Sequence, residues 1–462
     1  MTVIASISGI RGTIGGKMGE SLSPIDVVRY TAAYAAWIKQ QYPNNRHVVV
    51  GRDARISGDM MRRLVVGTLQ SMGIDVTDLD LACTPTVEIA VIAEKAAGGI
   101  ILSASHNPKN WNALKLLNHL GEFLSDTEGK QILDLAQKAD FSFAEVEQLG
   151  KYTVKHTEYL HEHIRQILAL QLVDAPAIKK RNFKILVDGI NSVGGIALPA
   201  LLRALGVQQI VELHCKPDGN FAHNPEPLPE HLQSVALELK RQGCDLGIVL
   251  DPDADRLAFI CEDATMFGEE YTLVAVADYV LQHTPGCTVS NLSSTRALRD
   301  VAQWHQQTHH AAAVGEVNVV VKMKETGAVI GGEGNGGIIY PALHYGRDAL
   351  VGVALFLSHL AHFGKACSAL RSRYPNYVLV KNKAELPATA KLDDILHKIQ
   401  AKYKHQPMNT IDGLRLEFDS DWIHLRKSNT EPIMRIYAES ASEVTARTMI
   451  KQILYDIKYF SS

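Results

Sequence analysis

Residues 48–73 read VVVGRDARISGDMMRRLVVGTLQSMG: a short apolar run, a turn of glycines and charged residues, and then a helical pattern. The same order of features recurs at residues 183–206 (FKILVDGINSVGGIALPALLRALG) and 287–304 (CTVSNLSSTRALRDVAQW). Each stretch is typical of the first half of a strand–helix–strand unit. Because the three stretches lie far apart in the chain, they predict three similar α/β domains and not a short solenoid repeat.

The C-terminal part of the chain has a different pattern. After a proline turn it carries the strand-like runs DGLRLEF, WIHLRKSN and MRIYAES, followed by a helical segment at residues 442–459. This order predicts a small α+β unit. The expected fold class is therefore α/β, with three similar mixed α/β domains and a smaller C-terminal α+β domain. The domains are placed at residues 1–152, 153–262, 263–372 and 373–462.

Composition and charge narrow the functional classes. The chain has 462 residues and a formal net charge of -3, so its charge gives no indication of nucleic-acid binding. The most apolar stretch, residues 349–357, is shorter than the ~20 residues of a membrane-spanning helix and predicts a buried helix. The N-terminus lacks a signal-peptide pattern, and the six scattered cysteines favour a reducing compartment. We therefore expect a cytoplasmic protein bound neither to nucleic acid nor to membrane; the sequence gives no indication of its oligomeric state.

The hexapeptide DPDADR at residues 251–256 follows CDLGIVL, an apolar run that predicts a buried strand. Asp251, Asp253 and Asp255 alternate, so their carboxylates share a face of an extended backbone. Three hard oxygen ligands at the end of a strand suit Mg²⁺, and Arg256 beside them suits a phosphate. A solvated acidic turn and an EF-hand loop are the alternatives. The EF-hand fails because Arg256 stands where that loop needs glycine, and because a strand precedes the loop.

The segment LSASHNPKNWNALK, residues 102–115, places polar side chains in a turn after another strand-like run. Ser105 in this turn is suited to accept and return a phosphoryl group if a cation neutralises the charge, because a phosphoserine carries about −1.5 to −2 charges. Its phosphate would add an oxygen ligand to the ion held by the aspartates. The alternatives are a turn without chemistry and, for Lys115, a surface lysine.

Three further loops carry candidate binding residues. RKSNTEP at residues 426–432 combines a guanidinium, hydroxyls and an amide, which suits a phosphate dianion. GGEGNGG at residues 331–337 offers a carboxylate and an amide to sugar hydroxyls on a backbone that a ligand can approach closely. Near the N-terminus, SGIRGTIGG places Arg11 between glycines, and GRDARISG at residues 51–58 is equally consistent with a purely structural role. A capping loop and a flexible hairpin are the structural alternatives for the first two segments.

Taken together, and in this order from Ser8 to Glu439, the motifs resemble the α-D-phosphohexomutase superfamily, which includes phosphoglucomutase/phosphomannomutase and phosphoglucosamine mutase. The resemblance implies four domains around a central cleft. It also implies that Ser105 is the phosphorylated serine, and that it shares a Mg²⁺ ion with Asp251, Asp253 and Asp255. The other catalytic residues implied are Arg11, His106, Lys115 and Arg256, and the substrate contacts implied are Glu333, Arg426, Ser428, Asn429 and Thr430. The sequence of the loops themselves adds Asn335 and Arg435 as expected substrate contacts.

The sequence departs from the family pattern in three motifs. The threonine of the N-terminal GTSGIRG is absent. Many members have serine and histidine in the sugar loop where this chain has Asn335 and Gly337, so any role of that histidine has no residue here. Lys427 and Asn429 replace the usual proline and glycine of the phosphate loop. These changes resemble an archaeal-like branch and affect the identity of the sugar more than the phosphoryl transfer.

The expected reaction is a reversible conversion of hexose 1-phosphate to hexose 6-phosphate, through phosphorylated Ser105 and a hexose 1,6-bisphosphate that also serves as primer. Glucosamine phosphate is the preferred sugar phosphate, followed by glucose and mannose phosphates. Lys115 is the expected proton acceptor, which requires a depressed pKa. The alternatives are a sugar-phosphate phosphatase and a non-catalytic sugar-phosphate binder.

Overall fold

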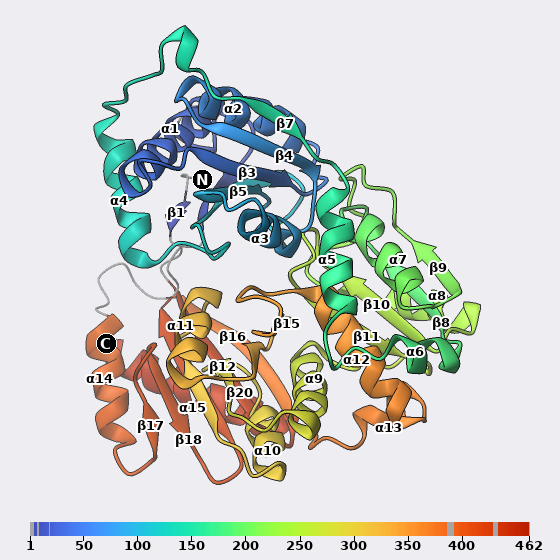
Figure 1. Cartoon of the computed structure of the whole chain (residues 1–462). Coiled ribbons are helices and arrows are strands. Elements are labelled where there is room, and N and C mark those ends of the chain that lie inside the picture. Colours follow the sequence, from blue (N-terminus) through green and yellow to red (C-terminus); the bar gives the residue numbers. More distant parts are fainter. Residues whose placement is uncertain (1–3, 7–8, 18, 386–391, 428–432, 462) are drawn as a thin grey trace.

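The computed structural model describes residues 4–6, 9–17, 19–385, 392–427 and 433–461. Four sheets follow one another along the chain, and each is the centre of one domain, numbered 1 to 4 (Figure 1). The predicted fold class, three mixed α/β domains and a C-terminal α+β domain, is confirmed. The exact domain boundaries stay a prediction, and the one at residue 152 falls at the start of a strand, Tyr152–Val154.

Domain 1 contains a seven-stranded sheet in the order β1-β2-β6-β5-β3-β4-β7. Strands β5, β3, β4 and β7 are parallel, whereas β6 and β1 pair in the antiparallel sense. The strands are β1 (Ile4–Ser6), β2 (Gly9–Thr13), β3 (His47–Arg52), β4 (Asp75–Leu81), β5 (Gly98–Leu102), β6 (Trp111–Leu117) and β7 (Tyr152–Val154). The helices are α1 (Pro24–Gln41), α2 (Gly58–Ser71), α3 (Thr84–Ala93) and α4 (Asp126–Lys138).

Domain 2 contains a four-stranded sheet in the order β11-β10-β8-β9, in which only β11 is antiparallel to its neighbour. Its strands are β8 (Lys184–Asp188), β9 (Gln209–Leu213), β10 (Leu246–Leu250) and β11 (Leu257–Cys261). Its helices are α5 (Glu158–Leu168), α6 (Ala175–Arg181), α7 (Gly194–Ala204) and α8 (Gln233–Gln242).

Domain 3 repeats this arrangement with the order β13-β12-β14-β15, and β15 is the antiparallel strand. The apolar stretch at residues 349–357 lies in a buried helix, as predicted. The strands are β12 (Thr288–Asn291), β13 (His309–Ala312), β14 (Ile330–Glu333) and β15 (Gly337–Ile339). The helices are α9 (Glu269–His283), α10 (Ala297–Trp304), α11 (Glu316–Thr326), α12 (Ala349–Phe363) and α13 (Cys367–Arg371).

Domain 4 contains a five-stranded antiparallel sheet in the order β16-β20-β19-β18-β17, packed against helices. In Figure 1 it lies below domain 1, at the lower left. The strands are β16 (Val378–Glu385), β17 (Met408–Asn409), β18 (Leu414–Glu417), β19 (Trp422–Lys427) and β20 (Ile433–Ser440), and the helices are α14 (Leu392–Lys402) and α15 (Glu443–Ser461).

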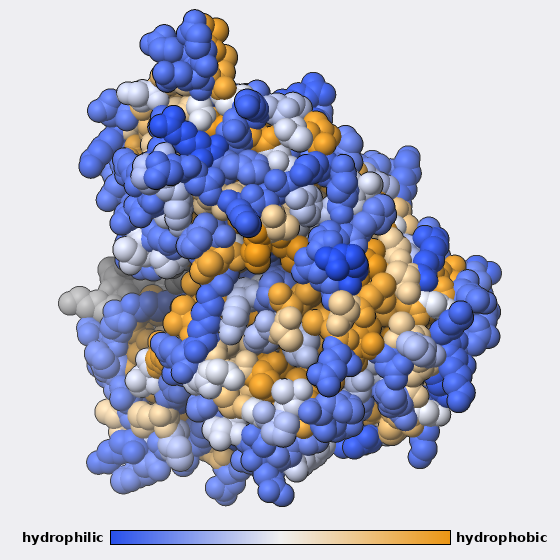
Figure 2. All heavy atoms as spheres, viewed as in Figure 1, coloured by the Kyte–Doolittle hydropathy of each residue, from blue (hydrophilic) through white to orange (hydrophobic). Residues whose placement is uncertain are grey.

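The apolar cores show how the domains are joined. One continuous core extends through domains 2 and 3, where α12 packs against α9 and α6, and it includes Cys83 of domain 1. The main core of domain 1 and the core of domain 4 are separate from it. On the face shown in Figure 2, apolar residues gather at mid-height, where domain 1 meets the domains below it. Among the described residues, no helix combines the length and the apolar character needed to cross a membrane.

Candidate active site

Ser105 lies in the loop that follows β5. It is 8% exposed and has a left-handed backbone, with φ of 48°, a conformation that is uncommon for residues other than glycine. Its N–H donates to Ser103 Oγ at 2.9 Å, and Ser103 Oγ donates to Asp53 Oδ2 at 2.7 Å. Such a backbone conformation persists only where the surrounding contacts determine it, so the loop around Ser105 is held in place.

The residue that holds this loop is Arg55, which the sequence analysis did not single out. It is 1% exposed, and its Nε donates to Asp53 Oδ2 at 3.0 Å. Its two terminal nitrogens donate to four backbone carbonyls between Ser105 and Trp111, so one guanidinium fixes the path of the chain from the serine onward. The acceptors are the carbonyls of Ser105, Asn107 and Pro108, each at 2.6 Å, and that of Trp111 at 3.0 Å.

The three aspartates of the DPDADR loop follow β10 and are fully buried. One carboxylate oxygen from each lies within 4.8 Å of the others. Asp253 Oδ1 and Asp255 Oδ1 are buried and accept no hydrogen bond within the described part of the chain. Buried polar atoms usually have a hydrogen-bond partner. Neighbouring carboxylate oxygens that lack one are suitable ligands for Mg²⁺. The residues present therefore fit a divalent cation.

Burial and neighbouring charges shift the pKa values of Asp251 and Asp255 in opposite directions. Burial and the neighbouring Asp255 and Asp253 raise the pKa of Asp251 well above its usual value. Burial also acts against ionisation of Asp255, but Arg347, Lys115 and Arg256 outweigh it and lower the pKa of that carboxyl. Carboxylates forced together in this way are stabilised by a shared cation.

Ser105 meets the aspartates directly, although they lie in different domains. Its Oγ donates to Asp251 Oδ2 at 2.8 Å, and His106 Nδ1 lies 3.5 Å from the same Oγ. Lys115, on β6, donates to Asp253 Oδ2 at 2.5 Å and lies 3.4 Å from Asp255 Oδ2. A hydroxyl, a carboxylate set and a lysine thus share one buried centre.

The pKa of Lys115 is shifted in the direction opposite to the one that its predicted role requires. Burial works against its charge, but Asp253 and Asp255 outweigh burial and raise its pKa above the usual value. A proton acceptor needs a depressed pKa, so in this arrangement Lys115 is the cationic partner of the aspartates. His106 has the opposite environment, since Arg256 and then burial lower its pKa well below the usual value, which favours the neutral imidazole.

Arginines from domains 1, 2 and 4 face the same region. Burial, followed by the charges of Arg435 and Arg256, lowers the pKa of Arg11. The Nε atoms of Arg11 and Arg256 are buried without a hydrogen-bond acceptor among the described residues, whereas Arg426 Nε forms an ion pair with Asp412. Arg426 and Arg435 lie directly opposite each other on β19 and β20, and paired like charges destabilise a sheet. A phosphate dianion would neutralise these guanidiniums.

Ser428, Asn429 and Thr430 of the predicted phosphate loop lie outside the described residues. The two arginines that flank it, Arg426 and Arg435, are described, and Arg426 Nε lies 3.3 Å from Asp412 Oδ2.

Glu333, at the end of β14, lies in a network that reaches the aspartates. Its Oε1 accepts from Asn291 Nδ2 at 2.7 Å and from the Gly315 N–H at 3.0 Å. Arg347 donates from Nη1 to Glu333 Oε2 at 2.8 Å and from Nη2 to Asp255 Oδ2 at 2.6 Å. Arg347, which the sequence analysis missed, therefore links the sugar loop of domain 3 to the aspartates of domain 2.

Arg347 also leaves no room for a side chain at position 337 of the sugar loop. A Cβ atom built on Gly337 would collide with the Arg347 side chain and would lie 3.1 Å from Asn335 Oδ1. Asn335 is partly exposed and accepts the Gly337 N–H at 3.2 Å. The arginine therefore fills the space that a side chain at position 337 would need.

Models of known protein families match the chain along most of its length. Four models match in order: phosphoglucomutase/phosphomannomutase alpha/beta/alpha domain I at residues 4–143, domain II at 159–265, domain III at 268–377, and the C-terminal domain at 377–454. A relative from Thermococcus kodakarensis named phosphoglucomutase/phosphomannomutase is 34% identical over 95% of this chain and 96% of its own. One from Methanopyrus kandleri, named probable phosphoglucosamine mutase, is 31% identical over 96% of this chain and 95% of its own.

A solved structure from Burkholderia thailandensis, described as a phosphoglucomutase/phosphomannomutase family protein, superimposes with a TM-score of 0.85 at 26% identity. The match covers 100% of this chain and 98% of that one. The chain therefore belongs to the phosphoglucomutase/phosphomannomutase family and is an isomerase of the phosphohexomutase type.

Proposed function

We propose that the protein interconverts hexose 1-phosphate and hexose 6-phosphate by transfer of a phosphoryl group to and from Ser105. The observation that best supports this function is the 2.8 Å hydrogen bond between Ser105 Oγ and Asp251 Oδ2, which joins the serine to the buried aspartates. A hydroxyl at this position lies next to the carboxylates that would hold the cation, and transfer of a phosphoryl group requires such a cation to neutralise its charge.

In the forward step, the bond between the phosphorus and Ser105 Oγ breaks and a bond to the free hydroxyl oxygen of the sugar phosphate forms. That hydroxyl loses its proton and Ser105 Oγ takes one up, so that a hexose 1,6-bisphosphate and a free serine hydroxyl result with no net release of protons. In the second step, after the bisphosphate has turned around, its other phosphate is transferred to Ser105 and the hexose 6-phosphate is left. A bisphosphate supplied from outside would prime an unphosphorylated enzyme.

Each group of residues has a separate task in this scheme. Asp251, Asp253 and Asp255, with the serine phosphate, would hold a Mg²⁺ ion, which neutralises charge on the transferred group when bound. Arg11 and Arg256 orient that group, because their Nε atoms are buried and without an acceptor in the described chain. The non-reacting phosphate binds Arg426 and Arg435, together with Ser428, Asn429 and Thr430, and Glu333 and Asn335 bind the sugar hydroxyls.

For the sugar, we propose glucosamine phosphate first and glucose or mannose phosphate second. The support is the name of the Methanopyrus kandleri relative, whereas the more similar Thermococcus kodakarensis relative supports the alternatives. We also propose that the protein is cytoplasmic, because all six cysteines are free thiols.

The deciding experiment is a coupled assay that compares the three hexose 1-phosphates in the presence of Mg²⁺ and a bisphosphate primer. We expect formation of the 6-phosphate, with the highest kcat/KM for glucosamine 1-phosphate. Release of inorganic phosphate without isomerisation would instead indicate a phosphatase, and binding without turnover would indicate a sugar-phosphate sensor.

A further inference from the structure

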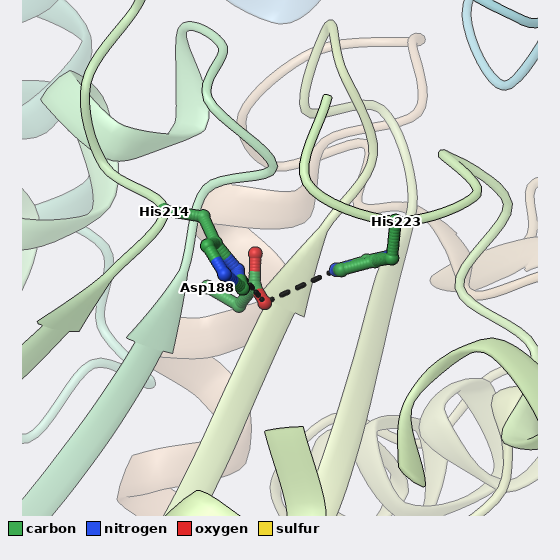
Figure 3. Close-up of side chains that lie close together, drawn as sticks. All are labelled: Asp188, His214 and His223. Carbon is green, nitrogen blue, oxygen red and sulfur yellow. Dashed lines mark hydrogen bonds and ion pairs between the residues drawn. The ribbon is translucent and has the colours of Figure 1, made fainter. Parts of the chain in front are cut away.

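A second group of metal-ligating side chains lies in domain 2, away from the aspartates of the active site. Asp188 is the last residue of β8, and His214 directly follows the neighbouring parallel strand β9. His223 comes from the loop that follows. Figure 3 shows the two imidazole rings pointing toward the Asp188 carboxylate from different sides. His214 Nδ1 lies 2.9 Å and His223 Nε2 3.1 Å from the same oxygen, Asp188 Oδ2.

The hydrogen bonds of His223 point to a cation between these groups. Its Nδ1 lies 2.8 Å from the backbone carbonyl of Asn224. A carbonyl only accepts, so Nδ1 has to carry a hydrogen. In a neutral imidazole the lone pair of Nε2 then faces the Asp188 carboxylate, and two acceptors oppose each other. A cation, either a second proton or a metal ion, is needed between them.

A metal ion accounts for the arrangement of both ring nitrogens. Histidines that bind a metal through one nitrogen usually donate the other N–H to a carboxylate or a backbone carbonyl, as His223 does toward Asn224. The Asp188 carboxylate is fully buried, and its Oδ1 accepts the Ile190 N–H at 2.8 Å. This hydrogen bond holds Oδ1 in place and leaves Oδ2 directed at the two imidazoles.

The donor set is selective for a particular class of ion. Two imidazoles and one carboxylate suit Zn²⁺ and related transition metals, whereas the three oxygens of the active site suit Mg²⁺. Donors on a tetrahedral ion with bonds of ~2.0–2.1 Å lie about 3.3 Å apart. The separations of 2.9 and 3.1 Å from Asp188 Oδ2 are close to that value.

The cluster lies behind the loops of the active site. Asp188 begins the turn that carries Ser192, whose Oγ donates to the Pro252 carbonyl at 2.5 Å and accepts the Ala54 N–H at 3.2 Å. Pro252 belongs to the aspartate loop, and Ala54 precedes Arg55. Residue 221, in the segment between His214 and His223, also contacts Arg55, whose guanidinium carbon lies 5.0 Å from the Phe221 ring.

We propose that Asp188, His214 and His223 form a second metal site, specific for Zn²⁺-class ions, that fixes the turns behind the serine and aspartate loops. The site is independent of the mutase reaction and would exist even if the proposed sugar or mechanism were wrong.

The test is metal binding by the purified full chain in excess Mg²⁺, which occupies the aspartates of the active site. After equilibrium dialysis against micromolar Zn²⁺, we expect one bound Zn²⁺ per chain, and Co²⁺ in its place should give visible absorption bands of an imidazole-ligated ion. His214→Gln and His223→Gln should each weaken Zn²⁺ binding by at least ~100-fold, since even loss of an outer-shell partner costs 10–100-fold.

Two variants serve as controls. His231→Gln removes a partly buried histidine of the same domain whose Nδ1 also lies 2.8 Å from a backbone carbonyl, that of Glu226, and should leave Zn²⁺ binding unchanged. Asp253→Asn alters the active site and should do the same. The proposal is overturned if the wild-type chain retains no Zn²⁺, because His223 is then an imidazolium paired with Asp188. It is also overturned if Asp253→Asn, and not His223→Gln, removes the Zn²⁺.

Discussion

Replacement of Arg55 by lysine tests whether one buried guanidinium sets the geometry of the reactive serine. Arg55 donates five hydrogen bonds, four of them to carbonyls of the serine loop. A lysine ammonium has three donors at one point, so at least two acceptors lose their partner. At about 1–3 kcal/mol for each buried acceptor, the loss is about 2–6 kcal/mol. That is comparable to or larger than the ~1–3 kcal/mol cost of a strained backbone such as that of Ser105.

We expect the serine loop of Arg55→Lys to relax, so that each turnover must restore the left-handed conformation of Ser105. If 2–4 kcal/mol of the loss appears in the barrier, kcat falls about 30- to 1,000-fold, since ~1.36 kcal/mol corresponds to tenfold in rate. KM for the hexose phosphate should change little, because Arg426 and Arg435 are untouched. The assay is the coupled mutase reaction, together with thermal unfolding of the same preparation.

The matched control is Arg415→Lys. Arg415 is also a buried arginine, 7% exposed, but it bonds to Glu417 and to the Leu292 carbonyl. It should lose thermal stability without a selective fall in kcat. A folded Arg55→Lys protein with a kcat within threefold of wild type would refute the reasoning, and so would an equal fall in kcat for the control.

Four other substitutions test separate parts of the site. Ser105→Ala should reduce mutase turnover to background while hexose phosphate still binds by calorimetry; wild-type turnover would exclude the phosphoserine. Asp253→Asn should raise the Mg²⁺ concentration for half-maximal activity at least tenfold, and an unchanged Mg²⁺ titration would remove this residue from the metal site. Arg426→Ala should raise KM for hexose phosphate about 10- to 100-fold. Ser105 phosphorylation, measured by mass spectrometry, should stay near the wild-type level. An unaffected KM would show that Arg426 does not bind the non-reacting phosphate. Gly337→Ala should destabilise the wild-type protein, yet cost about 1–3 kcal/mol less in an Arg347→Ala background, because the Cγ and Cδ atoms that the new Cβ would meet are gone; additive unfolding free energies would show that the two positions are independent.

The meeting of Ser105 and Asp251 could be predicted mainly from the family resemblance of the motifs that carry them. Local pattern shows only that each residue follows an apolar strand, β5 or β10, where loops often carry chemistry. The fold class could be predicted from pattern itself, because the three repeated strand–turn–helix stretches each form a strand followed by a helix. Local sequence pattern is enough to predict a feature that depends on a single segment, such as a strand followed by a helix.

Arg55 and Arg347 could not be assigned roles in this way. A charged residue in a turn gives no indication of which distant carbonyls or carboxylates it reaches, and the partners of Arg347 come from two domains. The direction of the Lys115 pKa could not be predicted for a related reason, since it depends on Asp253 and Asp255, which are far away in the sequence. His214 and His223 likewise share no spacing motif with Asp188, so only the fold brings them together.

The continuous apolar core of domains 2 and 3 limits how a bisphosphate can be turned within the enzyme. Because α12 is packed between helices of both domains and Arg347 joins Asp255 to Glu333, these two domains form a single rigid frame. In the proposed reaction, we therefore expect the aspartates and Glu333 to keep a constant separation. Because Ser105, Lys115 and Ala54 bond domain 1 to domain 2, we expect room for the intermediate to rotate to come from motion of domain 4, whose core is separate.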